Sequence, residues 1–456
     1  MGLCVQWEHN LGDYYIKEMS IMERPNVLFI LADDLGWGDV GYHGSPIQTP
    51  NIDRLAQNGV ELECHYVCPL CTPTRASFLT GRYASRFGKH ATVPSNDPVL
   101  SDGYWTLAQM FKDTGYSTGL FGKWHLGSDP QYYPGRYGFD YSYGSLAGGI
   151  DPYTHRYKEG PYTYTWHRNG ELVEEQGHAT DLITQEAINW ITSQENPWFC
   201  YVPYTAVHVP IRAPEEWIDR YWNNRYDVDP ARDGSFKTYA AYTSHMDYCI
   251  GKLIETLKCI DQLDNTIIVF ASDNGAVITN PKDDVAKYPG SHEDTPRLGS
   301  NYPLRGGKAQ LYEGGIRTPA ILSWRGKVKP FKLEHPISIV DWMPTFAALL
   351  ECMPPKNPKW DGINILPLLF EEDKHDNSAN PERLFYWNLT HDRFAVRYGD
   401  WKLIVDRREG QEIKELFNLK EDPYEQRNQA LRYPEIVNRL EKMIEEQHRL
   451  DDDCEI

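Results

Sequence analysis

Four short apolar runs, each followed at once by polar side chains, constrain the fold of this chain more than any other feature. They lie at residues 27–31, 118–121, 198–202 and 267–270. Helical patterns alternate with them, at 180–191, at 236–258, and after Thr49, a predicted N-cap before Pro50 in a helix that Gly59 closes. Continuous apolar strands alternating with helices are typical of a parallel sheet covered on both faces. The sequence therefore predicts an α/β fold with a large, mostly parallel central sheet flanked by helices.

The polar residues after these runs are expected to meet, because ligands of such sheets bind beyond the carboxyl ends of the strands. In chain order they are Asp33, Asp34, Lys123, His125, His208, Asp273 and Asn274. The two acidic pairs offer only oxygen ligands, which suit Ca²⁺ or Mg²⁺ rather than zinc. Each pair also has a structural interpretation, the first as a helix cap and the second as a turn. Four strand ends together favour a binding site.

The charge of the chain excludes some partners. Its 65 acidic residues outnumber its 46 basic residues, for a net charge of −19 over 456 residues. Such a surface repels nucleic acid and anionic membranes, so neither is an expected partner. An anionic substrate would need cationic groups concentrated in the site. The aromatic content of 13%, with 30 tyrosines and 14 tryptophans, fits surfaces that face sugars or aryl groups.

Cysteine usage and the first residues indicate the compartment. Nine cysteines without the spacing of a disulfide scaffold predict mostly reduced thiols. Residues 1–22 contain Glu8, Asp13 and Glu18 and no continuous apolar run, which is not the pattern of a signal peptide. No stretch approaches the roughly 20 apolar residues of a membrane helix. We expect a cytoplasmic protein, or a periplasmic or secreted one if the true start differs.

Changes in composition and in the pattern of apolar residues along the chain predict its domains. Residues 1–22 are an expected N-terminal extension, 23–370 a catalytic domain, and 371–456 a smaller α+β subdomain. The subdomain begins with a polar linker at 371–377. A hairpin at 394–405 turns at Gly399-Asp400. A third strand at 415–419 and an amphipathic helix at 434–450 complete a small antiparallel sheet with one helix, packed on the main domain.

The most informative motif for function is at residues 71–81. Cys71 is followed by Pro73, Arg75 and Thr80-Gly81. This pattern resembles the signature of the type I sulfatases, in which the cysteine is oxidised to formylglycine. The spacing of Cys64, Cys68 and Cys71 also matches an iron–sulfur cluster of a radical enzyme, and buried thiols are a third interpretation. A cluster would leave Pro73, Arg75 and the carboxylates without a role.

The resemblance extends over roughly residues 24–425. Matching strings lie at 25–39, 49–56, 122–127, 272–275, 304–308, 312–315 and 341–345. It implies an alkaline-phosphatase-like sandwich fold. It also implies that one Ca²⁺, with Mg²⁺ as the other candidate, binds Asp33, Asp34, Asp273, Asn274 and the modified residue 71.

The same resemblance implies the catalytic roles. The formylglycine hydrate made from Cys71 attacks sulfur, and its second hydroxyl expels sulfate as the aldehyde reforms. Arg75 positions the hydrate, Lys123 and Lys308 bind the sulfate, and His125 assists its release. His208 faces the leaving alcohol, and Lys308 shares this acid role. A formylglycine-generating maturation enzyme is the implied partner. The chain departs from many members at Thr74, where they have serine; the hydroxyl is kept.

The substrate prediction rests on the loop at 148–156, which is similar to the loop of N-acetylgalactosamine 4-sulfatases. There Asp151 and His155 would bind sugar hydroxyls and Arg156 a neighbouring acid group; a purely structural loop is the open alternative. We expect a sulfated saccharide of galactose or N-acetylgalactosamine type, or an aryl sulfate. The competing class is a phosphonate or phosphate ester hydrolase of the same superfamily, which a serine or threonine nucleophile with extra zinc ligands would favour.

Overall fold

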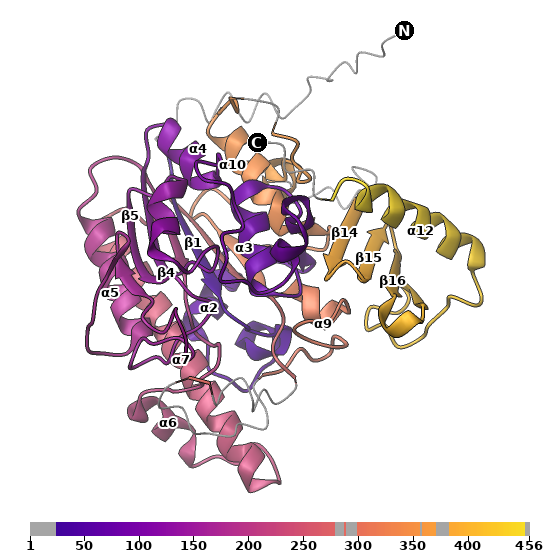
Figure 1. Cartoon of the computed structure of the whole chain (residues 1–456). Coiled ribbons are helices and arrows are strands. Elements are labelled where there is room, and N and C mark those ends of the chain that lie inside the picture. The colour runs from indigo at the N-terminus through magenta and orange to yellow at the C-terminus, as the bar shows by residue number, and fades with distance from the viewer. Residues whose placement is uncertain (1–23, 279–286, 289–298, 356–357, 371–382, 452–456) are drawn as a thin grey trace.

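A ten-stranded mixed sheet forms the centre of the molecule in the computed structural model (Figure 1). The structure describes residues 24–278, 287–288, 299–355, 358–370 and 383–451, so the predicted extension at 1–22 and the linker at 371–377 lie outside it. The strands run in the order β12 (Phe331–Leu333), β2 (Val60–Leu62), β11 (Ala320–Ser323), β9 (Thr266–Ser272), β1 (Asn26–Ala32), β8 (Trp198–Pro203), β4 (Ser117–Lys123), β5 (Tyr141–Ser145), β6 (Trp166–Arg168) and β7 (Glu171–Leu172).

The parallel arrangement predicted from the apolar runs is confirmed for the centre of the sheet. β9, β1, β8, β4 and β5 pair in parallel, and all seven residues of β1 are buried. The flanks differ, because β11 is antiparallel to both β9 and β2, and β6 is antiparallel to β5 and β7. These flanking strands are mostly short, and β7 is exposed, so they lack the continuous apolar run that marks a central strand.

Helices cover both faces of the sheet. Alternate residues of β1 point to opposite sides, so that Val27, Phe29 and Leu31 pack in one core cluster and Leu28 and Ile30 in the other. The first cluster contains residues of α3 (Cys71–Thr80), α4 (Leu107–Asp113), α10 (Trp342–Leu349) and α11 (Leu366–Phe370). The second contains residues of α2 (Pro50–Gln57), α5 (Ala179–Thr192), α6 (Glu215–Trp222) and α7 (Pro230–Cys259). Figure 1 shows the two groups of helices on either side of the strands.

Two predicted helix boundaries were wrong. α2 starts at Pro50 as expected, but it ends at Gln57 with Asn58 as its C-cap, so Gly59 does not close it. Gly59 is needed for a different reason, since a Cβ there would lie 2.4 Å from the carbonyl oxygen of Leu322 on β11. α7 begins at Pro230, six residues before the predicted start, because the Asp229 side chain caps it by accepting from the amide of Ala231.

The remaining elements complete the fold. A three-stranded sheet has the order β10 (Arg317–Thr318), β3 (His65–Tyr66) and β13 (Ile337–Ser338). The short α9 spans Glu313–Ile316. Short 3-10 helices lie at η1 (Trp37–Asp39), η2 (Gly41–His43), η3 (Ala84–Phe87), η4 (Lys89–Thr92), η5 (Pro130–Tyr132), η6 (Pro134–Tyr137), η7 (Ile339–Asp341) and η8 (Arg408–Gly410). Within the described ranges, no helix combines the length and the apolar character needed to cross a bilayer.

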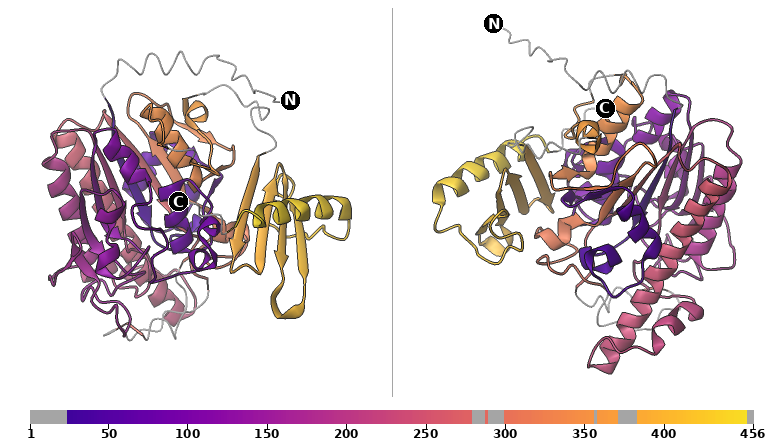
Figure 2. Two further views of the ribbon diagram at one scale, coloured as in Figure 1. Left: turned by 45° about the horizontal axis from the view of Figure 1, so that its top comes forward. Right: turned by 180° about the vertical axis from the view of Figure 1, so that it is seen from behind.

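The C-terminal residues form an antiparallel sheet and a helix beside the main body (Figure 2). The sheet order is β14 (Leu384–Leu389), β15 (Arg393–Tyr398), β16 (Trp401–Asp406) and β17 (Ile413–Asn418), and α12 (Pro434–His448) follows. The predicted hairpin is β15–β16 and the predicted third strand is β17; β14 was missed. One face of the sheet packs through Phe385 and Trp387 on Tyr66 of the main body, and the other packs on α12.

Candidate active site

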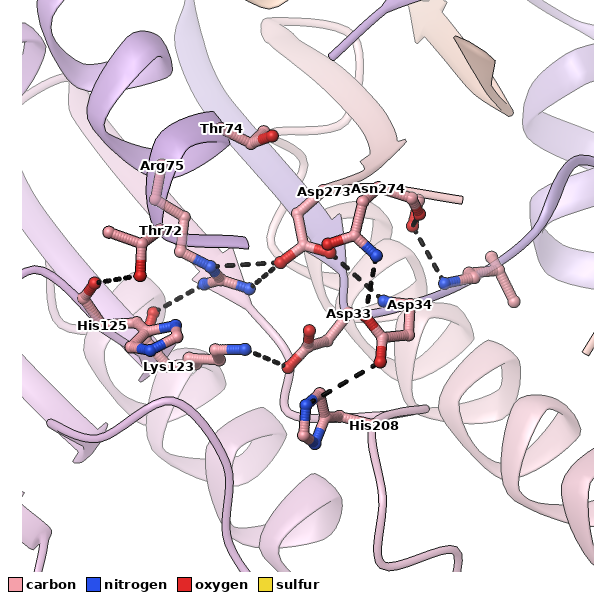
Figure 3. A network of polar contacts seen from close by, with 12 residues as sticks. Asp33, Asp34, Thr72, Thr74, Arg75, Lys123, His125, His208, Asp273 and Asn274 are labelled. Carbon is pink, nitrogen blue, oxygen red and sulfur yellow. Dashed lines mark hydrogen bonds and ion pairs between the residues drawn. The ribbon is translucent and has the colours of Figure 1, made fainter. Parts of the chain in front are cut away.

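The side chains that follow the central strands lie together at one edge of the sheet (Figure 3). Asp33 and Asp34 follow β1, Asp273 and Asn274 follow β9, and Lys123 is the last residue of β4. These strands are parallel, and β1 lies beside both β9 and β8. Their carboxyl ends therefore deliver the polar groups to one place, as the sequence pattern predicts.

Three ion pairs organise this edge. Lys123 Nζ lies 2.7 Å from Asp33 Oδ2, and both side chains are fully buried. Arg75 binds Asp273 Oδ2 through two nitrogens, at 2.7 and 3.2 Å. Lys308 Nζ lies 2.7 Å from Asp34 Oδ1. Each carboxylate is therefore paired with one cation before any ligand is considered.

Two buried oxygens at this edge have no hydrogen-bond donor among the described residues. They are Asp33 Oδ1 and Asn274 Oδ1. The amide nitrogen of Asn274 donates to Asp34 Oδ1 at 2.7 Å, which turns its oxygen in the opposite direction. Unpaired buried oxygens are unfavourable unless something binds them. Carboxylate and amide oxygens are the ligands of a hard divalent cation, so the residues present fit a Ca²⁺ or Mg²⁺ ion.

The two aspartates have opposite pKa shifts. Burial raises the pKa of Asp33 to about 8, although Lys123 opposes this. Burial also acts on Asp34, but Lys308, with His208 and Lys123, brings its pKa below the usual range. A divalent cation would favour the ionised form of both. The backbone of Asp34 is left-handed, with φ +65, which is unfavourable by about 1–3 kcal/mol for a residue other than glycine and is typical of functional sites.

Helix α3 carries the motif at 71–81. Cys71 is its first residue, all ten of its residues are buried, and Arg75 is one turn further along. Burial raises the pKa of the Cys71 thiol, whereas Lys123 and Lys308 act on it in the opposite direction. The Thr74 hydroxyl accepts from the amide of Cys68 at 3.0 Å and donates to its carbonyl at 3.2 Å, so it holds the loop before the helix.

Two histidines complete the edge. His208 Nδ1 hydrogen-bonds the carbonyl of Val209 at 2.7 Å, and Nε2 lies 3.8 Å from Asp34 Oδ2. Burial, followed by Lys308, lowers the pKa of His208 to about 3. His125 is buried, its Nδ1 has no hydrogen-bond partner among the described residues, and burial and then Lys123 lower its pKa well below the usual value.

Sequence reasoning missed the function of two glycines beside these rings. A Cβ on Gly148 would lie 2.2 Å from His125 Nε2, and a Cβ on Gly149 would lie 3.0 Å from His208 Nδ1. Both positions therefore leave room for an imidazole ring. The Gly-Gly pair was the available signal, but its partners are distant in the chain.

The predicted sugar-binding residues lie in the loop that follows these glycines. Asp151 is fully buried, accepts the amides of Tyr153 and Thr154, and pairs with Arg212 at 2.7 Å. His155 stacks on a tryptophan ring, and its Nε2 lies 3.0 Å from the Gly177 carbonyl oxygen. These contacts hold the loop. A role in substrate binding stays a prediction.

The loop borders a groove of about 500 Å³. It is lined by Tyr153, Thr154, His155, Arg156, Tyr164, Thr165, Trp166, Leu172, Val173, Glu174 and Glu175. The Arg156 guanidinium lies 5.0 Å from the centre of the Tyr164 ring. None of the polar residues described above at the edge of the sheet lines this groove, which is a separate depression.

The iron–sulfur interpretation of the three cysteines is wrong. Cys64 Sγ lies 3.1 Å from a nitrogen of Arg397, and Cys68 Sγ lies 3.7 Å from Ser77 Oγ. The turn after β2, the following loop and the start of α3 aim the three side chains at different neighbours.

Comparisons with known proteins agree with this geometry. A family model described as Sulfatase matches residues 25–352, and one described as N-sulphoglucosamine sulphohydrolase, C-terminal, matches residues 307–450. The chain is 33% identical to Arylsulfatase J of Mus musculus, with 91% of this chain and 74% of that protein covered. It is 33% identical to N-acetylgalactosamine-6-sulfatase of Homo sapiens, with 76% and 66% covered.

A solved structure is similar over nearly the whole chain. The crystal structure of Ps i-CgsB superposes with a TM-score of 0.80 at 32% identity, covering 95% of this chain and 94% of that one. The same protein in complex with k-i-k-neocarrahexaose also gives a TM-score of 0.80.

Proposed function

The chain belongs to the sulfatase family and is a sulfuric ester hydrolase, and we propose that it releases sulfate from a sulfated saccharide of galactose or N-acetylgalactosamine type, with formylglycine made from Cys71 and one Ca²⁺ ion. The observation that carries this proposal is the pair of unsatisfied buried oxygens, Asp33 Oδ1 and Asn274 Oδ1, beside Lys123 and Lys308. Oxygen ligands for a cation and ammonium groups for an anion lie at one sheet edge.

The cation and the formylglycine hydrate, which the proposal requires, would both lie at this edge of the sheet. Asp33, Asp34, Asp273 and Asn274 would bind the cation, which supplies positive charge that polarises a sulfate oxygen. Oxidation of Cys71 would supply an aldehyde hydrate as the nucleophile. The remaining steps belong to side chains of this chain.

Each side chain at the edge has a task that fits its position. Lys123 and Lys308 would stabilise charge on the sulfate oxygens in the transition state, in a site where water is largely excluded. Lys308 and His208 have the more accessible side chains, with 15% and 10% exposed, so they lie nearer the side from which the ester enters. His208 Nε2 is the ring nitrogen left for the leaving oxygen, because Nδ1 is bound to Val209. His125 would exchange a proton with the hydrate.

The saccharide substrate is supported by the relatives and by the groove. One relative is named for N-acetylgalactosamine, and Ps i-CgsB was solved with an oligosaccharide. The groove beside the 148–156 loop presents Tyr153 and Tyr164, which are 37% and 54% exposed, together with Arg156. Exposed aromatic rings suit the face of a sugar ring, and Arg156, which lies 4.0 Å from Glu174, adds a polar side chain beside them.

The nucleophile is tested on the purified full chain, produced with a maturation enzyme. Peptide mass spectrometry is expected to show an aldehyde in place of the thiol at residue 71, and sulfate release from sulfated galactose or N-acetylgalactosamine oligosaccharides is expected to follow the modified fraction. Cys71→Ser is expected to fold and to lose nearly all turnover. A fully active preparation with only unmodified cysteine would contradict the mechanism.

The substrate class is tested with loop variants. His155→Ala and Arg156→Ala are expected to reduce kcat/KM on the sulfated oligosaccharide far more than on an activated aryl sulfate, whose leaving group needs little recognition. Lys420→Ala, at an exposed site on the C-terminal region, is the matched control. Equal losses on both substrates would assign the loop a structural role only. Activity on phosphonate monoesters that exceeds the activity on every sulfate ester would favour the competing class.

A further inference from the structure

A second group of metal-type side chains lies away from the catalytic edge, between α5 and α7, which run side by side (Figure 1). Asp181 is in the first turn of α5, and His245 and Cys249 are one turn apart on α7. His245 Nε2 lies 3.0 Å from Asp181 Oδ2. Cys249 Sγ lies 3.6 Å from Asp181 Oδ1 and 3.8 Å from His245 Nε2. None of the three has a task in sulfate hydrolysis.

These atoms are largely removed from solvent. Cys249 is fully buried and His245 is 2% exposed. The other ring nitrogen of His245, Nδ1, has no hydrogen-bond partner among the described residues. The Asp181 side chain is 41% exposed, which leaves one open side. A buried thiol and imidazole beside a carboxylate are an unusual combination for a structural core, where apolar side chains would pack without a desolvation penalty.

We propose that Asp181, His245 and Cys249 form a Zn²⁺ site, with a water molecule in the fourth position on the exposed side. Zinc bonds of about 2.3 Å to sulfur and about 2.0 Å to nitrogen and oxygen, at tetrahedral angles, place the ligand atoms about 3.3–3.6 Å apart. The Cys249 Sγ–His245 Nε2 separation of 3.8 Å is close to this spacing, and the two Asp181 oxygens lie 3.0 Å from His245 Nε2 (Oδ2) and 3.6 Å from Cys249 Sγ (Oδ1), so a small rotation of the carboxylate would bring one oxygen to both. A mixed set of sulfur, nitrogen and oxygen ligands favours zinc over calcium.

The neighbouring side chains define the limits of the site. His178, the N-cap of α5, also lies close enough to Asp181 and His245 to share a metal ion with them. Both of its ring nitrogens are already hydrogen-bonded, Nδ1 by the amide of Thr180 and Nε2 to the Arg212 carbonyl oxygen at 2.9 Å, so we do not count it among the ligands. Lys252 Nζ lies 3.4 Å from Asp181 Oδ1 and competes with a cation there. Binding would release the Cys249 proton to solvent, and the thiolate and the carboxylate would then neutralise the two charges of zinc.

The position of the site links it to the substrate loop. The residue before His178 is Gly177, whose carbonyl binds His155, and Arg212 binds both His178 and Asp151. A zinc ion between α5 and α7 would therefore anchor the helix start on which the 151–156 loop is held. The inference does not depend on the sulfatase reaction, because the ligands are separate from those of the catalytic edge.

The experiment measures zinc in the full chain directly. Purified protein is stripped with a chelator, loaded with Zn²⁺, desalted and analysed for zinc and calcium. We expect about one zinc per chain in the unmutated protein and a loss of at least about tenfold in zinc content in Cys249→Ser and in His245→Gln. Cys200→Ser removes another fully buried thiol, on β8, and is expected to keep the zinc. Asp33→Asn alters the catalytic edge alone and is also expected to keep it.

Cobalt substitution gives a second readout that does not depend on activity. Co²⁺ in the unmutated protein is expected to show the visible absorption of a tetrahedral ion and a thiolate-to-metal band that Cys249→Ser abolishes. Circular dichroism of the metal-free variants separates loss of the site from loss of the fold. Zinc content unchanged by Cys249→Ser, or no zinc bound by the unmutated chain, would overturn the proposal.

Discussion

The histidines at the edge of the central sheet need neighbouring residues without side chains as well as their own imidazole rings. Gly148 is the clearest case, because a Cβ there would lie 2.2 Å from His125 Nε2. We expect Gly148→Ala to move the imidazole and to lower kcat by about 10²-fold, since a shift of about 1 Å in a catalytic group has an effect of this size. Kinetics and a thermal melt would show the loss of activity without global unfolding.

The matched control is Gly234→Ala. Gly234 is an exposed residue inside α7, and nothing lies within 4 Å of its added Cβ. Alanine there is expected to leave activity unchanged and to stabilise the helix by about 0.5–1 kcal/mol. Full activity in Gly148→Ala would show that the added Cβ does not displace the His125 imidazole, and would contradict the prediction.

A second prediction at the residue scale concerns acid stability. His65 is fully buried, and burial lowers its pKa to about 3. In the unfolded chain the same histidine has an ordinary pKa of about 6.5. Between about pH 6.5 and pH 3 the unfolded state therefore binds one proton more than the folded state, so the free energy of unfolding falls as the pH drops below about 6.5. We expect His65→Gln, which can still accept from Trp342 Nε1, to reduce the stability lost between pH 7 and pH 5 by on the order of 2 kcal/mol.

Urea unfolding at both pH values measures this difference. His90→Gln, at an exposed histidine, is the control for the exchange of histidine for glutamine. An identical pH dependence in His65→Gln and the unmutated chain would show that His65 does not contribute.

The sequence predicted the residues at strand ends better than those brought in by loops. Asp33, Lys123 and Asp273 follow apolar runs directly, so parallel pairing alone brings them together. Lys308 reaches the site through a loop whose backbone pairs with Ala276, and no local pattern marks that contact; only the family resemblance pointed to it. The ion pair of Asp151 with Arg212 likewise could not be predicted from the periodicity of apolar residues, because the two residues are distant in the sequence.

Among the elements, the start of α3 is held by a side chain rather than by packing alone. The Thr74 hydroxyl both accepts from and donates to the backbone of Cys68. Thr74→Val keeps the shape but leaves the amide and the carbonyl of the partly buried Cys68 without this partner, which costs about 1 kcal/mol. We expect lower stability and lower activity in Thr74→Val and near-normal values in Thr74→Ser. Denaturant midpoints of the two variants test this, and equal midpoints would contradict it.

Strand prediction succeeded for long apolar runs and failed for short strands, whether buried or exposed; β11, with four buried residues, was not predicted. β1, with seven buried residues, reads as one apolar run, and β8 is similar. β7 has two exposed residues and β6 spans three residues, so neither leaves a pattern long enough to recognise. The mixed character of the sheet comes from short strands on its two flanks, β11 on one side and β6 and β7 on the other. Their pairing is decided by tertiary contacts, which sequence periodicity does not record.

At the scale of the whole molecule, buried charges join the C-terminal sheet to the main body. Lys402 on β16 is fully buried and lies 2.8 Å from both Glu313 and Glu425. Without Lys402, Glu425 loses its cation and Glu313 keeps only Arg317, at 3.9 Å, and the Tyr66 hydroxyl. We therefore expect Lys402→Met to destabilise the protein by about 3 kcal/mol. The triple variant with Glu313→Gln and Glu425→Gln is expected to recover part of that loss.

Lys414→Met on β17 is the control, because its ion pairs with Glu412 and Glu441 are partly exposed and worth about 1 kcal/mol or less. Urea unfolding followed by fluorescence compares the three proteins. A loss in Lys402→Met no larger than in Lys414→Met would show that the junction does not rely on this cluster.

The enclosure of α3 also sets an order of events during synthesis. Cys71 is 2% exposed, and every residue of its helix is buried between the sheet and its neighbours. An enzyme that modifies this side chain must enclose the segment around it, which the finished fold does not present. If Cys71 is converted to formylglycine as proposed, the burial of this helix implies that the conversion precedes folding, so the active fraction of a preparation would be set while the chain is still nascent. On that proposal, protein that folds with an unmodified Cys71 would stay inactive until it is unfolded again.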